Sequence, residues 1–160
     1  FHVTGVQTCA LPISRMARTW FGGDALRLFG SPVRRFLARA ARIFPIDDRA
    51  AGGAIATGRA VLARGQALGW FPEGWRSPDG QLQDFLPGIG EMVREFGGVI
   101  VPMRIAGTYE VLPRGHRFPR ARPIRVTFGA PITAERAVAE GKDAAGIAKR
   151  LHDAVAAIPA

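Results

Sequence analysis

The chain has 160 residues, of which 48% are hydrophobic and 22% charged, so it is long enough for one domain with a core and too apolar to be disordered. Its net charge of +9 favours an anionic partner: a nucleic acid, an anionic membrane surface or a phosphorylated small molecule. Cys9 is the single cysteine, which excludes an internal disulfide, and no apolar run approaches the roughly 20 residues that cross a bilayer, so we expect any membrane association to be peripheral.

The first residues are expected to be foreign to the protein. The segment from Val3 to Ile13, VTGVQTCALPI, resembles at every position the conceptual translation of a common short-read sequencing adapter. A natural N-terminal strand or tail is the alternative. We therefore expect residues 1 to about 14 to be an artefact, and residues 15–160 to be a partial domain whose gene continues upstream.

From residue 15 onward, strands alternate with helices, which indicates an α/β domain. Ser31 and Pro32 are typical of a helix start, and Val33, Phe36, Leu37 and Ala40 then share one face. In chain order the patterns predict a basic helical segment over 15–42, a strand over 43–46, a helix over 49–64, a strand over 67–71, a turn over 76–80, a helix over 88–96, a strand over 99–105, a loop over 113–123, a strand over 124–128 and a closing helix over 142–157.

The strand over 99–105 is a continuous, β-branched run, which predicts that it is buried in a sheet covered on both faces. The expected fold is therefore a single-layer mixed sheet with helices on both faces. No repeat or linker divides the chain.

The segment FPEGWRS, residues 71–77, directly follows a predicted strand, where ligands bind in α/β folds. Gly74 lets the backbone turn sharply or approach a ligand, and Arg76 offers a planar fork of donors that suits a phosphate. Glu73 has two candidate roles: it orients Arg76, or it accepts a hydrogen bond from a substrate hydroxyl. On spacing alone, a solvated turn with an ordinary Glu–Arg pair is the alternative.

FPEGWRS resembles FPEGTRS, the signature of glycerol-phosphate acyltransferases, and its neighbours resemble that family in order. Residues 79–82 and 85–90 match the S-x-x-G-x-L-x-x-F-x-x-G continuation, and VPMRI at 101–105 resembles the V-P-V-x-I strand. Gly107-Thr108 and LPRG at 112–115 come next, and 126–132 resembles V-x-x-G-x-P-I. The chain thus resembles a glycerolipid acyltransferase of the 1-acylglycerol-3-phosphate acyltransferase type. The resemblance implies the α/β fold of that family, incomplete here at its N-terminus.

The resemblance implies that a fatty acyl group moves from acyl-CoA or acyl-carrier protein to the hydroxyl of a lysophospholipid in phospholipid biosynthesis. In the family, an upstream His-x-x-x-x-Asp supplies the general base and the acid that orients it. None of the three histidines here has an acid five positions later. We therefore assign no catalytic residue, expect that motif upstream, and expect this fragment to be inactive.

By the same resemblance, Glu73, Gly74, Arg76 and Ser77 form the acceptor site, which faces a head-group pocket with Arg76 on the phosphate or another anion. The resemblance implies no cofactor and no metal, and no Cys/His/Asp cluster has metal-ligand spacing. Two departures bear on the acceptor. Trp75 stands where threonine is usual in the family, which makes phosphate-bearing glycerol less secure as substrate. Asp48 takes the place of the arginine in the family's I-F-I-D-R segment, so we assign no site residue to 43–48.

The loop from Arg114 to Arg125 holds five arginines and no acid. It is a candidate contact for an anionic membrane, an acyl carrier or nucleic acid, or it is simply solvated; Phe118, its single aromatic residue, counts against a stacking surface for single strands. We expect the protein at the cytoplasmic face of the cell membrane, with an acyl thioester, a lysophospholipid and an anionic membrane as partners and no nucleic acid. A catalytically silent lipid- or carrier-binding module and a basic nucleic-acid-binding domain remain as alternative functions.

Overall fold

The computed structural model describes residues 19–24, 29–46, 51–116 and 118–159, which belong to two compact units, Phe1–Gly69 and Trp70–Ala160. The segment expected to be an artefact, 1–14, lies outside the described residues, as does Asp48.

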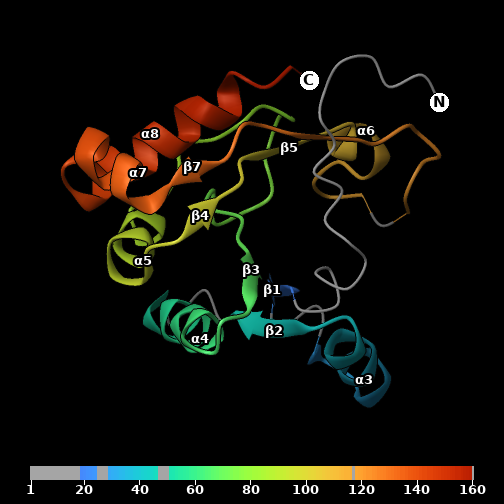
Figure 1. Ribbon diagram of the computed structural model, residues 1–160. Coiled ribbons are helices and arrows are strands. Elements are labelled where there is room, and N and C mark those ends of the chain that lie inside the picture. Colours follow the sequence, from blue (N-terminus) through green and yellow to red (C-terminus); the bar gives the residue numbers. More distant parts are fainter. Residues whose placement is uncertain (1–18, 25–28, 47–50, 117, 160) are drawn as a thin grey trace. The chain divides into compact units, whose positions relative to one another are not determined.

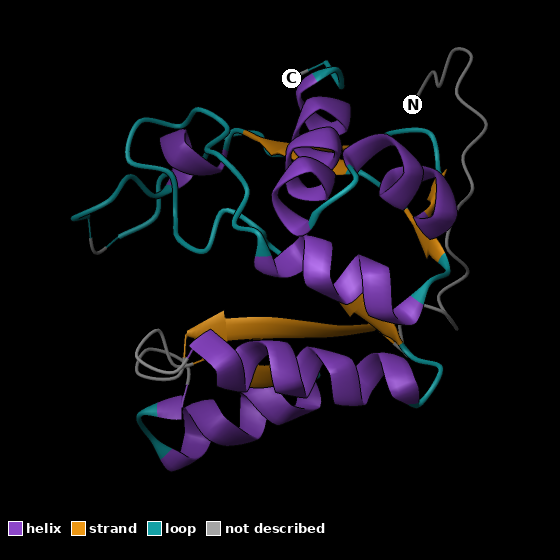
Figure 2. Cartoon of the chain, turned by 90° about the vertical axis from the view of Figure 1, so that its left-hand side faces the viewer, coloured by secondary structure: helices purple, strands orange, loops and turns teal. Residues whose placement is uncertain are grey.

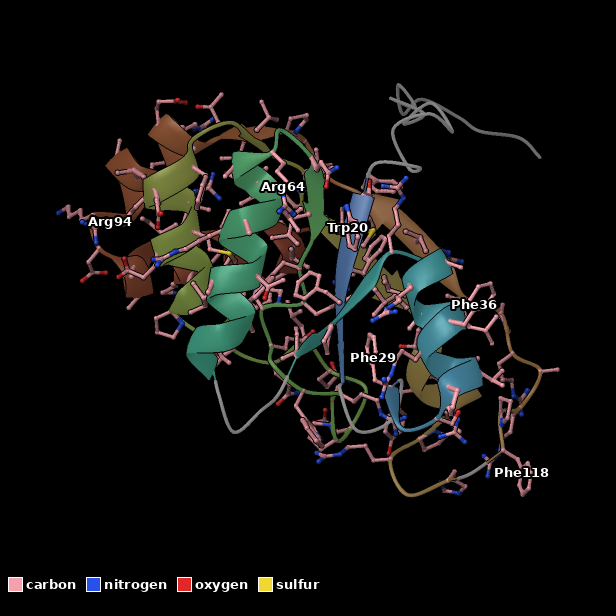
Figure 3. The ribbon with its side chains drawn as sticks, turned by 90° about the horizontal axis from the view of Figure 1, so that it is seen from below. Trp20, Phe29, Phe36, Arg64, Arg94 and Phe118 are labelled. Carbon is pink, nitrogen blue, oxygen red and sulfur yellow. The ribbon has the colours of Figure 1, made fainter. Side chains whose placement is uncertain are left out.

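The first unit is built on a parallel three-stranded sheet in the order β2-β1-β3. Its strands are β1 (Thr19–Asp24), β2 (Ile43–Ile46) and β3 (Ala67–Gly69), and its helices are α3 (Pro32–Ala40) and α4 (Ala51–Ala63). Because β2 and β3 lie on opposite sides of β1, right-handed crossovers place α3 and α4 on opposite faces of this sheet. Figure 3 shows the two helices on either side of β1.

The first strand corrects the prediction of a helical segment over 15–42, because residues 19–24 are extended. Thr19, Trp20 and Phe21 favour a strand and the following glycine pair disfavours a helix, a local signal that the basic composition hides. The predicted helix start is confirmed: Ser31 Oγ accepts a hydrogen bond from the backbone N of Arg34 at 3.3 Å. The strand over 43–46 is confirmed with its predicted bounds.

The second unit is held together by three packed helices, α5 (Gly88–Phe96), α7 (Ala134–Gly141) and α8 (Ala144–Ala156) (Figure 1). Apolar side chains from these helices and from the short strand just before α7 form its core; they are Val93, Ile132, Ala134, Ala137, Ile147 and Leu151. At the surface, the Glu140 carboxylate accepts from Arg136 Nε at 2.7 Å and also from Arg150, which ties α7 to α8. The pKa of Glu140 is lowered by these hydrogen bonds, first by that from Arg136.

The run over 99–105 forms two short strands instead of one. Strand β4 (Val99–Ile100) pairs antiparallel with β7 (Ile132–Thr133), and β5 (Met103–Ala106) pairs antiparallel with β6 (Arg125–Phe128). Pro102 lies at the break, because it has no N–H for a ladder, and its carbonyl accepts from Gly129 N at 2.8 Å. Val99 is exposed, so the prediction of one buried continuous strand is wrong.

The α/β class is confirmed, and the described strands form three small sheets in place of the single sheet expected. The patterns did not predict β7, α7 or the single-turn helix α6 (Thr108–Val111), which lies among loops in Figure 2. No helix in the described ranges is long and apolar enough to cross a membrane.

Candidate functional site: the 71–86 loop

The FPEGWRS segment opens a long loop that runs from the end of β3 to the start of α5. Gly74 N donates to Phe71 O at 3.2 Å, and Leu86 N donates to Pro72 O at 2.8 Å, so the two ends of the loop are held together. Gly74 has a φ of +74°, and a Cβ there would lie 2.6 Å from Cδ1 of Leu86. Glycine is therefore required by backbone conformation and by close packing.

Glu73 is half-buried, and its Oε2 accepts a hydrogen bond from the backbone N of Gln83 at 2.9 Å. The Glu73 carboxylate thus contacts the returning part of the loop, ten residues further along the chain. Among the described residues, no ion pair joins it to Arg76. Of its two candidate roles, orienting Arg76 is not what the structure shows. Glu73 fixes the loop's shape.

Ser77 also acts within the loop. Its Oγ lies 3.0 Å from Asp79 Oδ1 and accepts from Gly80 N at 2.9 Å. Asp79 Oδ1 in turn accepts from Gln81 N at 3.0 Å. The hydrogen bond from the Gln81 backbone, followed by that from Ser77, lowers the pKa of Asp79, so the turn is held by an ionised carboxylate.

The loop meets the segment that contains α6. Arg76 Nη2 lies 3.5 Å from the carbonyl oxygen of Pro113, at the limit of a hydrogen bond. The guanidinium of Arg114 lies over the ring of Trp75, with its Cζ 5.6 Å from the ring centroid. Gly80, at φ +83°, packs against Tyr109 of α6. These contacts bring LPRG, residues 112–115, beside FPEGWRS.

Arg76 and Arg114 are both exposed, and no carboxylate of the described residues pairs with either. Their donors are thus available to an external anion, and the indole ring supports one of them. A phosphate suits two guanidinium forks because it offers several strong acceptor oxygens. Arg114 was not among the predicted site residues; its only signal was the position of LPRG after the motif.

The two histidines among the described residues, His116 and His152, lie outside the FPEGWRS segment. The His152 ring packs edge-on against Phe85, with centroids 5.2 Å apart and planes at 83°, and its Nδ1 lies 3.3 Å from Asp153 Oδ1. The His116 ring is exposed on the arginine-rich loop. Phe118 lies at the far end of that loop (Figure 3). No group of acidic, histidine and cysteine side chains in the described ranges is arranged to hold a metal.

An open hollow of about 420 Å³ lies between α5 and α7. It is lined by Val93, Arg94, Gly97, Ala134, Glu135, Val138 and Ala139. None of these belongs to the motif, so the hollow is not the head-group pocket expected beside Glu73 and Arg76. The motif arginine lies on an exposed surface.

A family model described as Acyltransferase matches residues 8–106, which is more than half of the chain and includes FPEGWRS. The chain belongs to the acyltransferase family. The family resemblance is thereby confirmed. The matched range begins inside the segment expected to be foreign and ends at the last residue of β5.

Curated relatives of this acyltransferase family member carry a consistent name. The 1-acyl-sn-glycerol-3-phosphate acyltransferase CHLREDRAFT_174358 of Chlamydomonas reinhardtii is 30% identical over 121 residues, which cover 76% of this chain and 35% of that protein. The chloroplastic 1-acyl-sn-glycerol-3-phosphate acyltransferase LPAT1 of Arabidopsis thaliana is 36% identical over 55 residues, or 34% of this chain and 15% of that protein. The chain thus spans about a third or less of these relatives. No solved structure matches it.

Proposed function

We propose that the chain carries the acceptor-binding part of an enzyme that moves a fatty acyl group from acyl-CoA or acyl-carrier protein to the hydroxyl of a lysophospholipid. The observation that supports this is that Arg76 and Arg114 are exposed on neighbouring segments: Arg76 Nη2 lies 3.5 Å from Pro113 O, and the Arg114 guanidinium lies over the Trp75 ring. The relatives' printed names refer to a phosphate-bearing acceptor, 1-acyl-sn-glycerol-3-phosphate, which such a pair suits.

The reaction needs a general base, which the family supplies from a His-x-x-x-x-Asp motif that this sequence does not contain. The acceptor oxygen attacks the thioester carbon, its proton passes to a general base, the carbon–sulfur bond breaks, and the thiol leaves with a proton. The arginines orient the acceptor, because holding its phosphate fixes its hydroxyl relative to the thioester. Because no histidine of the chain has an acid five positions later, we expect this chain to bind the acceptor and not to transfer the acyl group.

The partners follow from this chemistry. The donor is itself an activated thioester, so the transfer requires no metal or cofactor. Both lysophospholipid and product are membrane lipids, and the cytoplasmic leaflet is anionic, so a basic chain of net charge +9 fits a peripheral place on that surface.

Binding of the acceptor is tested by calorimetric titration of the chain with lysophosphatidate below its micellar concentration. Arg76→Gln removes hydrogen bonds to a charged group, which are worth about 1.5–3 kcal/mol, so we expect binding to weaken roughly tenfold or more. The control Arg94→Gln removes the same charge from α5 and leaves binding unchanged. Equal affinities for the parent and Arg76→Gln would refute the assignment.

Three further measurements separate the alternative functions. Thiol release from acyl-CoA in the presence of lysophosphatidate is expected to be absent, and its detection would contradict the inactivity of this chain. Clean sequence upstream of residue 15 is expected to encode His-x-x-x-x-Asp; an intact gene without it would favour the silent lipid- or carrier-binding module. Tight DNA or RNA binding that falls steeply with salt would favour the nucleic-acid-binding domain.

A further inference from the structure

Helix α3 has its apolar stripe on the outside. Its buried residue is Ala38, which is 4% exposed, whereas Val33, Phe36 and Leu37 are 69%, 72% and 59% exposed. At about 100° per residue, these three side chains share one face and Ala38 lies nearly opposite them. In Figure 3, Phe36 points away from the sheet. An amphipathic helix of a closed domain shows the reverse arrangement, with its apolar stripe toward the core.

The surroundings of this stripe are basic. Arg39 is exposed on the flank of the stripe next to Phe36, Arg35 is exposed on the side of the helix away from the stripe, and residues 25–46 contain five arginines and no acid. A helix with an apolar face, basic residues on its remaining surface and no acid is typical of helices that lie in the interface of an anionic bilayer.

We propose that α3 docks on anionic lipid, with Val33, Phe36 and Leu37 inserted among the acyl chains and Arg39 beside them at the head groups. Arg35 then faces the water, where its charge still adds to the attraction of the surface. Charge complementarity favours lipid over a second copy of this chain, because a symmetric contact through α3 would bring the arginines of the two helices close together. The same positive charge attracts phosphatidylglycerol or another anionic lipid within a Debye length of the surface.

Flotation of the full chain with vesicles tests this directly, using phosphatidylcholine with and without phosphatidylglycerol at low and high salt. The triple variant Val33→Ser/Phe36→Ser/Leu37→Ser is expected to lose at least tenfold in partition onto anionic vesicles at either salt concentration. The double variant Arg35→Gln/Arg39→Gln is expected to lose binding mainly at low salt, where the two charges that it removes are least screened in the parent. A matched charge control, Arg64→Gln/Arg94→Gln, also lowers the net charge by two and retains binding.

Two checks keep each outcome decisive. The triple variant should unfold at the parent's temperature, because its three side chains are already exposed; a clear loss of stability would show that the stripe is covered in solution and would overturn the inference. Light scattering should give the same mass for the parent and the triple variant, and a dimer that this variant dissolves would assign the face to a second copy. Unchanged flotation of the triple variant would also overturn the inference that α3 docks on lipid.

This inference does not rest on acyl transfer. Flotation uses neither acyl donor nor lysophospholipid, so its failure leaves the proposed acceptor site standing. Conversely, a failed titration of lysophosphatidate leaves the vesicle result intact.

Discussion

The substitution Gly74→Ala probes the conformation on which the candidate site depends. Gly74 has a φ of +74°, where an L-residue pays about 1–2 kcal/mol. Its new Cβ would lie 2.6 Å from Cδ1 of Leu86, so that side chain must leave its rotamer at a cost of about 0.5–1.5 kcal/mol. We therefore expect Gly74→Ala to lower the free energy of unfolding by about 2–3 kcal/mol.

The two terms are separated by removing the obstacle. Leu86 is 56% exposed, so Leu86→Ala alone is expected to cost under about 1 kcal/mol. In the double variant the steric term disappears and the backbone term remains, so the two substitutions should couple favourably by about 0.5–1.5 kcal/mol. Urea unfolding of the full chain, followed by tryptophan fluorescence, gives all four corners of the cycle.

The control is Gly53→Ala, at an exposed position in helix α4, where alanine is favoured and stability should stay level or rise. Gly74→Ala should also weaken lysophosphatidate binding, because the loop that carries Arg76 shifts with it. If Gly74→Ala is as stable as the parent, or if Leu86→Ala gives it no relief, the reasoning about this loop is wrong.

The core of the second unit makes a second prediction: Ile147→Ala empties a fully buried site between α7 and α8 and should cost about 2–5 kcal/mol in urea unfolding. Acid should also destabilise the chain, because hydrogen bonds lower the pKa values of Asp79 and Glu140 in the folded state. That stabilisation is complete above the unfolded pKa values of about 4 and is lost as pH falls through the lower folded values, so unfolding temperatures measured from neutral pH downward should drop only below about pH 4. Finally, Trp75→Thr removes the ring beneath Arg114, a contact worth about 0.5–1 kcal/mol at an exposed position, so lysophosphatidate binding should weaken about two- to fivefold in calorimetry. An unchanged affinity would show that the ring does not position this arginine.

Local signals determined much of the fold. Ser31 and Pro32 predict the start of α3, and the runs over 43–46 and 88–96 predict β2 and α5 with their observed bounds, because capping, branching and periodicity act within a few residues. Where a local signal was overridden by a broader pattern, the prediction failed: the basic character of 15–42 hid the strand at Thr19–Asp24. The apolar run over 99–105 likewise hid the break at Pro102.

The sequence by itself determined the family motif, its glycine and its arginine, because FPEGWRS with its following segments is specific over a short distance. It did not determine the partner of Arg76 or the position of Arg114 over Trp75, which lie in segments about forty residues apart and meet only after the 71–86 loop has closed against the α6 segment. Nor did it determine which face of α3 is covered: periodicity shows that Val33, Phe36 and Leu37 share a side, but only packing against β2 decides that this side faces outward. Long-range contacts fix both features, and no local pattern encodes them.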